Sequence, residues 1–178
     1  HLAAPSGTTD LADEIFATIP LVTLALERGD LDGDGVDEVI VGADDGVYVL
    51  STPLSGFYTL DDIDALSGVG SVAVEALAVG DLDDDGQLDL CAGRPDMAPT
   101  GRAHLWTDIT GAPAVELHGI DVGDRTGSGL AMSNDLSGDR VTDLVVVAEL
   151  NEEGGREAGS AWLVHGGTLA ASIYMEDL

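Results

Sequence analysis

Residues 30–42 read DLDGDGVDEVIVG, an acidic loop that runs directly into an apolar segment rich in β-branched residues. The pattern returns at residues 81–93 as DLDDDGQLDLCAG and, more altered, at residues 135–147 as DLSGDRVTDLVVV. The second and third copies begin 51 and 54 residues after the one before. Recurrence at a nearly constant period of this length indicates a protein built from repeated structural units.

The acidic loops have the spacing of a calcium site. Oxygen-bearing side chains stand at loop positions 1, 3, 5 and 9, and glycine stands at position 6 of the first two copies. Calcium takes about six to eight oxygen ligands, so carboxylates that converge on one centre suit it. An EF-hand is disfavoured, because Val41, Ala92 and Val146 stand where its glutamate belongs and strand-forming residues flank each loop. Ordinary polar turns are the alternative, but turns do not need oxygen-bearing side chains at positions 1, 3, 5 and 9 together in three copies.

Short β-type segments recur at matched places around each loop. Before the loops lie residues 22–26, 74–79 and 129–132; after the apolar segments come residues 46–50, 102–106 and 161–165; the fourth set is 57–60, 114–117 and 172–175. Within the third strands, Tyr48, His104 and Trp162 align. Four strands in about 50 residues match one blade of a β-propeller. We therefore expect an all-β fold of four-stranded blades with every acidic loop on one rim.

We expect one propeller segment over residues 1–178. Residues 1–20 would supply a strand of a preceding blade, and the three blades would span residues 21–70, 71–122 and 123–178. Closed propellers use about four to eight blades, so three form a partial or half propeller. Two copies would hold about seven repeats. The alternatives are therefore a homodimer that completes a seven-bladed ring and a piece of a longer parent chain.

Composition limits the partners. The chain has 34 acidic residues against 6 Lys plus Arg, a net charge of −28. Nucleic acids and anionic membranes attract clustered cations, so neither is an expected partner, and no apolar run is long enough for membrane insertion. The hydrophobic fraction of 44% is enough for a folded core. A single cysteine, Cys91, excludes an internal disulfide and is expected to be a buried apolar residue.

The loop and the strand after it resemble the FG-GAP repeat of integrin α-chain β-propellers and their bacterial relatives. The likeness is clearest over residues 30–43, and weaker traces of the motif stand at residues 126–129 and 93–95. The resemblance implies structural Ca²⁺ on the face opposite the usual ligand surface. In the first two loops it implies side-chain ligands and position-7 carbonyls from Asp30, Asp32, Asp34, Val36, Glu38, Asp81, Asp83, Asp85, Gln87 and Asp89.

The third loop is expected to bind calcium most weakly or to stay empty. Its ligands would be Asp135, Ser137, Asp139, the carbonyl of Val141, and Asp143. Ser137 replaces a carboxylate by a neutral hydroxyl, and calcium affinity falls with ligand charge. Arg140 stands at the glycine position, where a left-handed backbone costs a non-glycine residue about 1–2 kcal/mol.

The expected function is a calcium-stabilised adhesion, protein-interaction or structural module located outside the cell, at the cell surface or in the periplasm. Its partner, a protein or a glycan, is not identified by the sequence. We expect no enzyme, because His1, His104, His118 and His165 show neither metal-ligand spacing nor a triad context. Two alternatives remain: a lectin-like propeller that binds carbohydrate, and an accessory propeller of a polysaccharide-active enzyme.

Overall fold

A computed structural model describes residues 17–18, 23–51, 56–57, 63–66, 71–156 and 158–178. The described chain is all-β apart from a single 3₁₀ turn at Met175–Asp177, which confirms the expected fold class. The strands are β1 (Ala17–Thr18), β2 (Thr23–Gly29), β3 (Glu38–Ala43), β4 (Val47–Leu50), β5 (Gly56–Phe57), β6 (Asp64–Ala65), β7 (Ala76–Gly80), β8 (Asp89–Arg94), β9 (Arg102–Trp106), β10 (Val115–His118), β11 (Thr126–Ser133), β12 (Asp143–Ala148), β13 (Ser160–Val164) and β14 (Ser172–Tyr174).

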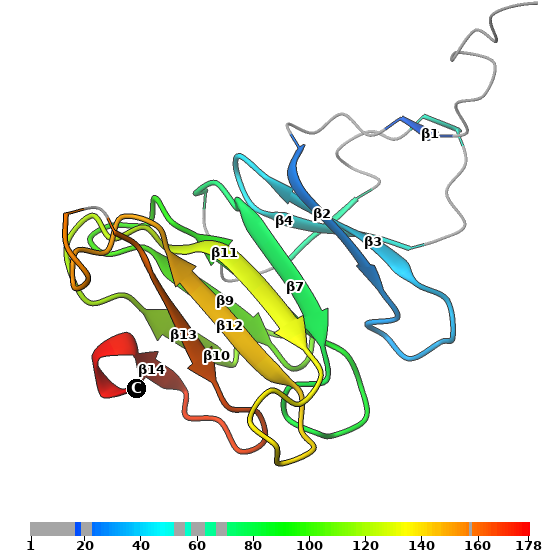
Figure 1. The fold of residues 1–178 in the computed structure, drawn as a ribbon. Coiled ribbons are helices and arrows are strands. Elements are labelled where there is room, and N and C mark those ends of the chain that lie inside the picture. Colours follow the sequence, from blue (N-terminus) through cyan, green and yellow to red (C-terminus); the bar gives the residue numbers. More distant parts are fainter. Residues whose placement is uncertain (1–16, 19–22, 52–55, 58–62, 67–70, 157) are drawn as a thin grey trace, which may run out of the picture.

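The strands form three main sheets that follow one another along the chain (Figure 1). The first sheet has the order β2-β3-β4-β6, the second β7-β8-β9-β10 with β14 at its edge, and the third β11-β12-β13. β1 and β5 make a separate parallel pair. The first three strands predicted for each repeat are therefore present in order, and each acidic loop joins the first strand to the second, as expected.

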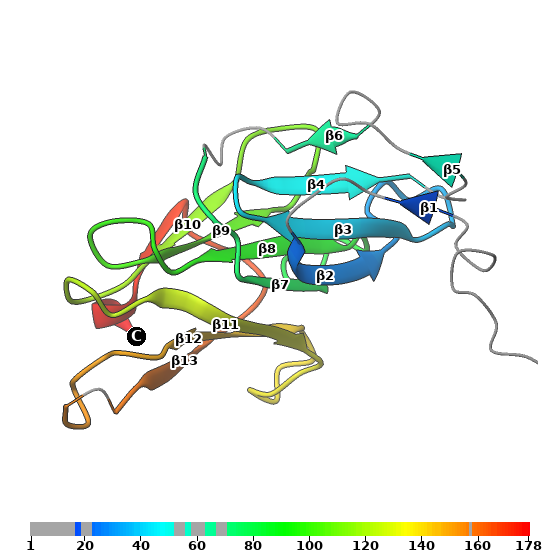
Figure 2. The same ribbon diagram turned by 90° about the horizontal axis from the view of Figure 1, so that it is seen from above.

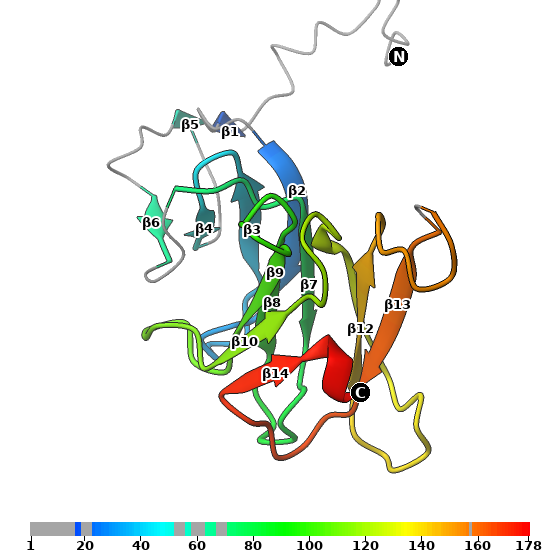
Figure 3. The same ribbon diagram turned by 90° about the vertical axis from the view of Figure 1, so that its left-hand side faces the viewer.

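The first strands of the three sheets lie side by side, with β7 between β2 and β11 (Figure 1). The sheets succeed one another in chain order (Figure 2). All three acidic loops lie at the same end of the molecule (Figures 1 and 3). The arrangement agrees with the prediction that the loops share one rim. The described sheets do not close into a ring, so the propeller itself stays a prediction.

Two hydrophobic cores hold the sheets together. Ile40 and Val49 of the first sheet pack with Leu90 and Trp106 of the second. On the opposite face of the second sheet, a larger cluster joins it to the third sheet, with Leu82, Cys91, Leu105, Leu117, Leu144, Val146 and Met175 among its members. Every residue of β8 is buried, because alternate side chains enter the two cores. Strand burial on both faces explains the unbroken apolar run after the second loop, and it confirms that Cys91 is buried.

The second and third sheets approach closely at paired glycines. A Cβ atom on Gly93 would stand 2.0 Å from the carbonyl oxygen of Gly127, so any side chain at position 93 would force the two backbones apart. Next to it, Arg125 forms ion pairs with Glu75 at 2.8 Å, with Glu149 at 2.6 Å and with Asp96. These acids lie in segments that flank both sheets, so one cation connects the two repeats.

The fourth strand of the second repeat is present as predicted, as β10 beside β9, but that of the third repeat differs from the prediction. Residues 172–175 were expected to complete the third repeat, but β14 pairs in parallel with β10 of the second sheet, with Leu117 opposite Ile173. Ile173 and Met175 reach the core between the second and third sheets there, and Met175 is 2% exposed. In the first repeat, β6 (Asp64–Ala65) pairs with β4. Residues 58–60 and most of the expected N-terminal strand lie outside the described residues.

Candidate metal centres

The three acidic loops share one hydrogen-bonded frame. The amide of position 2 donates to the carboxylate of position 9, and the amide of position 6 donates to the carboxylate of position 1. The amide of position 7 donates to the carboxylate of position 5. The donor–acceptor distances in the three loops are 2.9, 2.6 and 2.7 Å for the first bond, 2.9, 3.1 and 2.8 Å for the second, and 2.8, 2.8 and 2.9 Å for the third. Three copies of one frame confirm that the sequence repeat is a structural repeat.

Each loop turns through two left-handed residues. At position 6 these are Gly35, Gly86 and Arg140, with φ of 90°, 90° and 78°. The strained backbone expected at Arg140 is therefore present. At position 4 they are Gly33, Asp84 and Gly138, with φ of 76°, 62° and 93°. The left-handed conformation at position 4 was not predicted from the sequence, although aspartate tolerates it better than most residues.

Every loop also contains one buried oxygen that finds no hydrogen-bond partner among the described residues. These atoms are Asp30 Oδ1, Asp89 Oδ1 and Ser137 Oγ. Each belongs to a residue predicted to be a calcium ligand. Buried polar atoms are nearly always satisfied, and leaving a carboxylate oxygen without a partner costs free energy. A cation in the loop would satisfy these oxygens, so the donor sets of the first two loops fit the calcium that the sequence predicts.

In the first two loops the acids also come within reach of one ion. Asp30, Asp32 and Glu38 each place a carboxylate oxygen within 4.8 Å of the others. In the second loop Asp81, Asp83 and Asp85 do the same. The predicted ligands Asp34 and Asp89 lie outside these groups. Val36, Gln87 and Val141 donate their amides to position 5, and the metal role of their carbonyls stays a prediction.

Crowding and burial make these carboxylates unfavourable as bare anions. Burial raises the pKa of Glu38, with smaller contributions from the charges of Asp32 and Asp34. Burial likewise raises the pKa of Asp83, and Asp85 adds to the effect. Asp89 is fully buried, and desolvation raises its pKa to about 6. A divalent cation would reverse each of these effects, because an adjacent positive charge favours the ionised carboxylate.

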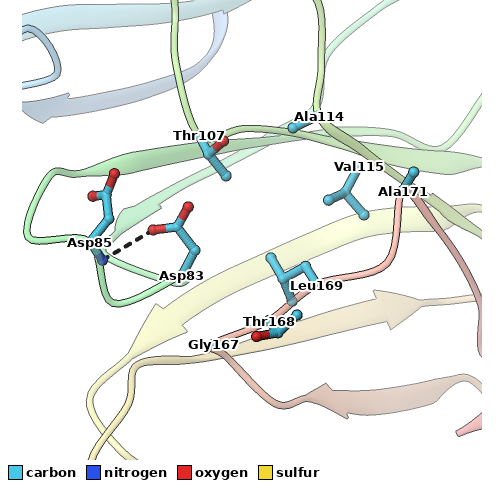
Figure 4. Close-up of a pocket in the computed structure, with 9 residues that line it drawn as sticks. All are labelled: Asp83, Asp85, Thr107, Ala114, Val115, Gly167, Thr168, Leu169 and Ala171. Carbon is cyan, nitrogen blue, oxygen red and sulfur yellow. Dashed lines mark hydrogen bonds between the residues drawn. The ribbon is translucent and has the colours of Figure 1, made fainter.

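A hollow of about 420 Å³ opens beside the second loop (Figure 4). Asp83 and Asp85 form one side of it, and the segment from Gly167 to Leu169 forms the other side. Thr107, the residue after β9, also lines the hollow. The amide of Asp85 donates to Asp83 Oδ1 at 3.2 Å. The second candidate centre is therefore open to solvent and to small polar molecules.

The third loop groups different residues. The atoms within 4.8 Å of one another belong to Asp139, Asp143 and His165, so the acid of position 1, Asp135, is absent from this group. Asp135 instead accepts the amides of Gly138, Asp139 and Arg140. His165 was not among the metal ligands predicted from the sequence. The alignment of Tyr48, His104 and Trp162 contains the signal for this histidine. The residues three places further along each repeat are Ser51, Thr107 and His165, so His165 occupies an equivalent position at the end of the third strand.

His104 is a packing residue, as its alignment suggests. It is 1% exposed, and Tyr48, His104 and Trp162 pair with Val41, Ala92 and Val146, which are equivalent positions in the three repeats. Burial, with a smaller contribution from the charge of the nearby Arg94, lowers the pKa of His104 to about 4. The imidazole is therefore neutral in the folded protein near pH 7.

Comparison with known proteins supports the relationship that the loops suggest. No protein-family profile matches the chain. Human integrin alpha-IIb is 30% identical over 72% of the chain. The chain is similar to an integrin α subunit. The matched region is 14% of that protein's length, so the likeness indicates an integrin-like relationship for a small part of it. Among the described residues, no helix is long and apolar enough to cross a membrane.

Proposed function

We propose that this chain is a segment of an FG-GAP-type β-propeller in which Ca²⁺ in the first two acidic loops stabilises neighbouring blades. Its role is that of an adhesion, protein-interaction or structural module outside the cell, without catalytic activity. The observation that carries the proposal is the unpartnered buried oxygen in each loop, within a hydrogen-bonded frame that occurs three times. The similarity to human integrin alpha-IIb supports the same assignment.

Calcium has a structural role in this proposal. Each loop connects the first two strands of its sheet, and its buried acid is held by the amide of position 2. An ion there would pull positions 1, 3, 5 and 9 together and so fix the start of the second strand. Millimolar calcium outside cells fills even weak sites of this kind, which is why an extracellular location suits the module.

The direct test is thermal unfolding of the full chain after chelator treatment, with and without about 1 mM Ca²⁺, together with a calorimetric titration. We expect calcium to raise the melting temperature. We expect the titration to show two calcium ions bound per chain at saturation. An unchanged melting temperature together with no binding heat would refute the calcium assignment.

A carbohydrate-binding role is the second candidate. The hollow beside the second loop has the threonine hydroxyls and carboxylates that sugar hydroxyls bind. Among the residues that line it none is aromatic, so the stacking surface that usually holds a sugar ring is missing from this hollow. Binding on a glycan array that depends on Thr107 and Thr168 would favour this second function.

A further inference from the structure

We propose that the third loop, together with His165, forms a site for a borderline transition-metal ion of the Zn²⁺ class and not for calcium. The inference rests on the proposed metal-loop architecture and assigns a different ion to one of its three members. Its basis is the group formed by Asp139, Asp143 and His165, whose ligand atoms lie within 4.8 Å of one another.

An imidazole nitrogen changes the preferred ion. Calcium binds oxygen, whereas zinc binds histidine nitrogen and carboxylate oxygen at about 2.0–2.2 Å, usually with four ligands. Two carboxylates and one histidine leave a fourth position for water or for the nearby hydroxyl of Ser137. Ligand atoms of a tetrahedral zinc ion stand about 3.3 Å apart, so the observed group needs only a modest contraction.

The sheet places His165 at this position. β13 pairs with β12 so that Val164 lies opposite Leu144, and the next residue falls beside Asp143. The equivalent residues in the other repeats also border their loops: Ser51 lines a hollow with Asp32 and Glu38, and Thr107 lines one with Asp83 and Asp85. The end of the third strand thus faces the loop in every repeat, and in the third it carries an imidazole.

The chain after His165 is held in place. The amide of Gly166 donates to Asp143 Oδ1 at 3.3 Å, and the amide of Gly167 donates to the carbonyl of Leu82 at 2.6 Å. A Cβ atom on Gly166 would stand 2.1 Å from the carbonyl oxygen of Thr142. The backbone that bears His165 is therefore positioned by both the second and the third loop before any ion binds.

The third loop is at the same time a poor calcium site. Its position 3 is Ser137, whose buried Oγ lies near Asp143 yet finds no hydrogen-bond partner of acceptable geometry among the described residues. Asp135, the acid of position 1, lies outside the group of converging ligand atoms, so a calcium ion there would lack a second carboxylate as well. Fewer carboxylates lower the affinity for calcium, whereas a neutral imidazole is a suitable ligand for zinc.

The test titrates Zn²⁺ into the chelator-treated full chain in the presence of saturating Ca²⁺, and uses Co²⁺ as a spectroscopic substitute. We expect one Zn²⁺ per chain and visible Co²⁺ absorption of tetrahedral type. His165→Asn should weaken Zn²⁺ binding at least about tenfold and abolish this absorption, since even the loss of an outer partner costs about 10–100-fold in affinity. His165 is exposed, so the variant should fold. His118→Asn is the matched control and should bind Zn²⁺ as the wild type does.

Undiminished Zn²⁺ binding by His165→Asn, or the absence of Zn²⁺ binding when calcium is present, would overturn the inference. The proposed calcium function is tested separately in the same samples. His165→Asn should keep the full calcium-induced rise in melting temperature. If that rise is missing in the wild type while Zn²⁺ binding depends on His165, the calcium proposal fails and the zinc site stands.

Discussion

Asp89→Asn is the substitution that tests the second loop most sharply. Asp89 is fully buried, its Oδ2 accepts the amides of Leu82 at 2.6 Å and Asp83 at 3.2 Å, and its Oδ1 is the unpartnered atom. Asparagine keeps the size and one oxygen for the two amides but removes the charge. The variant therefore separates the loop's internal hydrogen bonds from its metal binding.

The expected effect follows from linkage. An ion that binds only the folded state at about 100 times its dissociation constant stabilises it by about 2.7 kcal/mol. For a chain of this size, about 1 kcal/mol changes the melting temperature by about 2–4 °C. Loss of the second-loop ion should therefore lower the melting temperature in calcium by about 5–10 °C. In chelator the change should be small, because desolvation already disfavours the Asp89 carboxylate, whose pKa is raised to about 6.

Asp84→Asn is the matched control. Asp84 is exposed, lies between ligand positions in the same loop and has a φ of 62°, which asparagine adopts readily. It removes the same charge and should leave the calcium effect intact. Differential scanning calorimetry of both variants, with calcium and with chelator, shows whether Asp89 acts as a metal ligand or only through the charge of the loop. Equal losses for Asp89→Asn in the two buffers would refute the ligand role, and equal losses for the two variants would show that only loop charge matters.

Three further predictions concern stability and assembly. The pKa of His104 is about 4 in the folded protein and near 6.5 in the unfolded chain. The stability that comes from this difference, about 3 kcal/mol, is complete above pH 6.5 and is lost as the pH falls towards 4. His104→Phe should flatten this part of the pH–stability curve measured by urea titrations. Gly93→Ala should destabilise the chain by about 1–3 kcal/mol because its Cβ would meet the Gly127 backbone, whereas Gly46→Ala, with open space around it, should change the unfolding midpoint little. Leu26 is 61% exposed on β2, so Leu26→Asp should convert a homodimer formed through this strand to a monomer in light scattering; a monomeric wild type at micromolar concentration with a cooperative melt would contradict dimerisation.

The loops and most strands could be predicted from the sequence because their determinants are local. Positions 1, 5 and 9 of each loop bind amides only a few residues away, so spacing alone defines the frame. Alternating or continuous apolar residues likewise mark the strands, as at β8 and β9. Local determinants recur with the repeat, and comparison of the three copies shows them directly.

The contacts that the sequence did not reveal depend on segments far apart in the chain. β14 has the expected β-type sequence, but its partner is decided by the core that Ile173 and Met175 can reach. Arg125 meets Glu75 across 50 residues and Glu149 across 24, a pairing that no periodic pattern encodes. His165 joins Asp143 through the register of two strands. Each of these required the sheets to be placed in space.

The three loops show how a repeat can diverge while its frame persists. The hydrogen bonds from backbone amides to the carboxylates of positions 1, 5 and 9 are present in all three copies. They are present even in the third, which has serine at position 3 and arginine at position 6. These bonds connect backbone to carboxylate and are formed within the chain itself, so they can hold the hairpin in shape whichever ion the loop binds. Under the proposed function, the ion would be selected by two residues outside these shared hydrogen bonds, namely position 3 and the residue after the third strand. In the first two repeats those are Asp32 with Ser51 and Asp83 with Thr107, all oxygen donors. In the third they are Ser137 and His165, and this exchange is where the metal preference of the third loop should change.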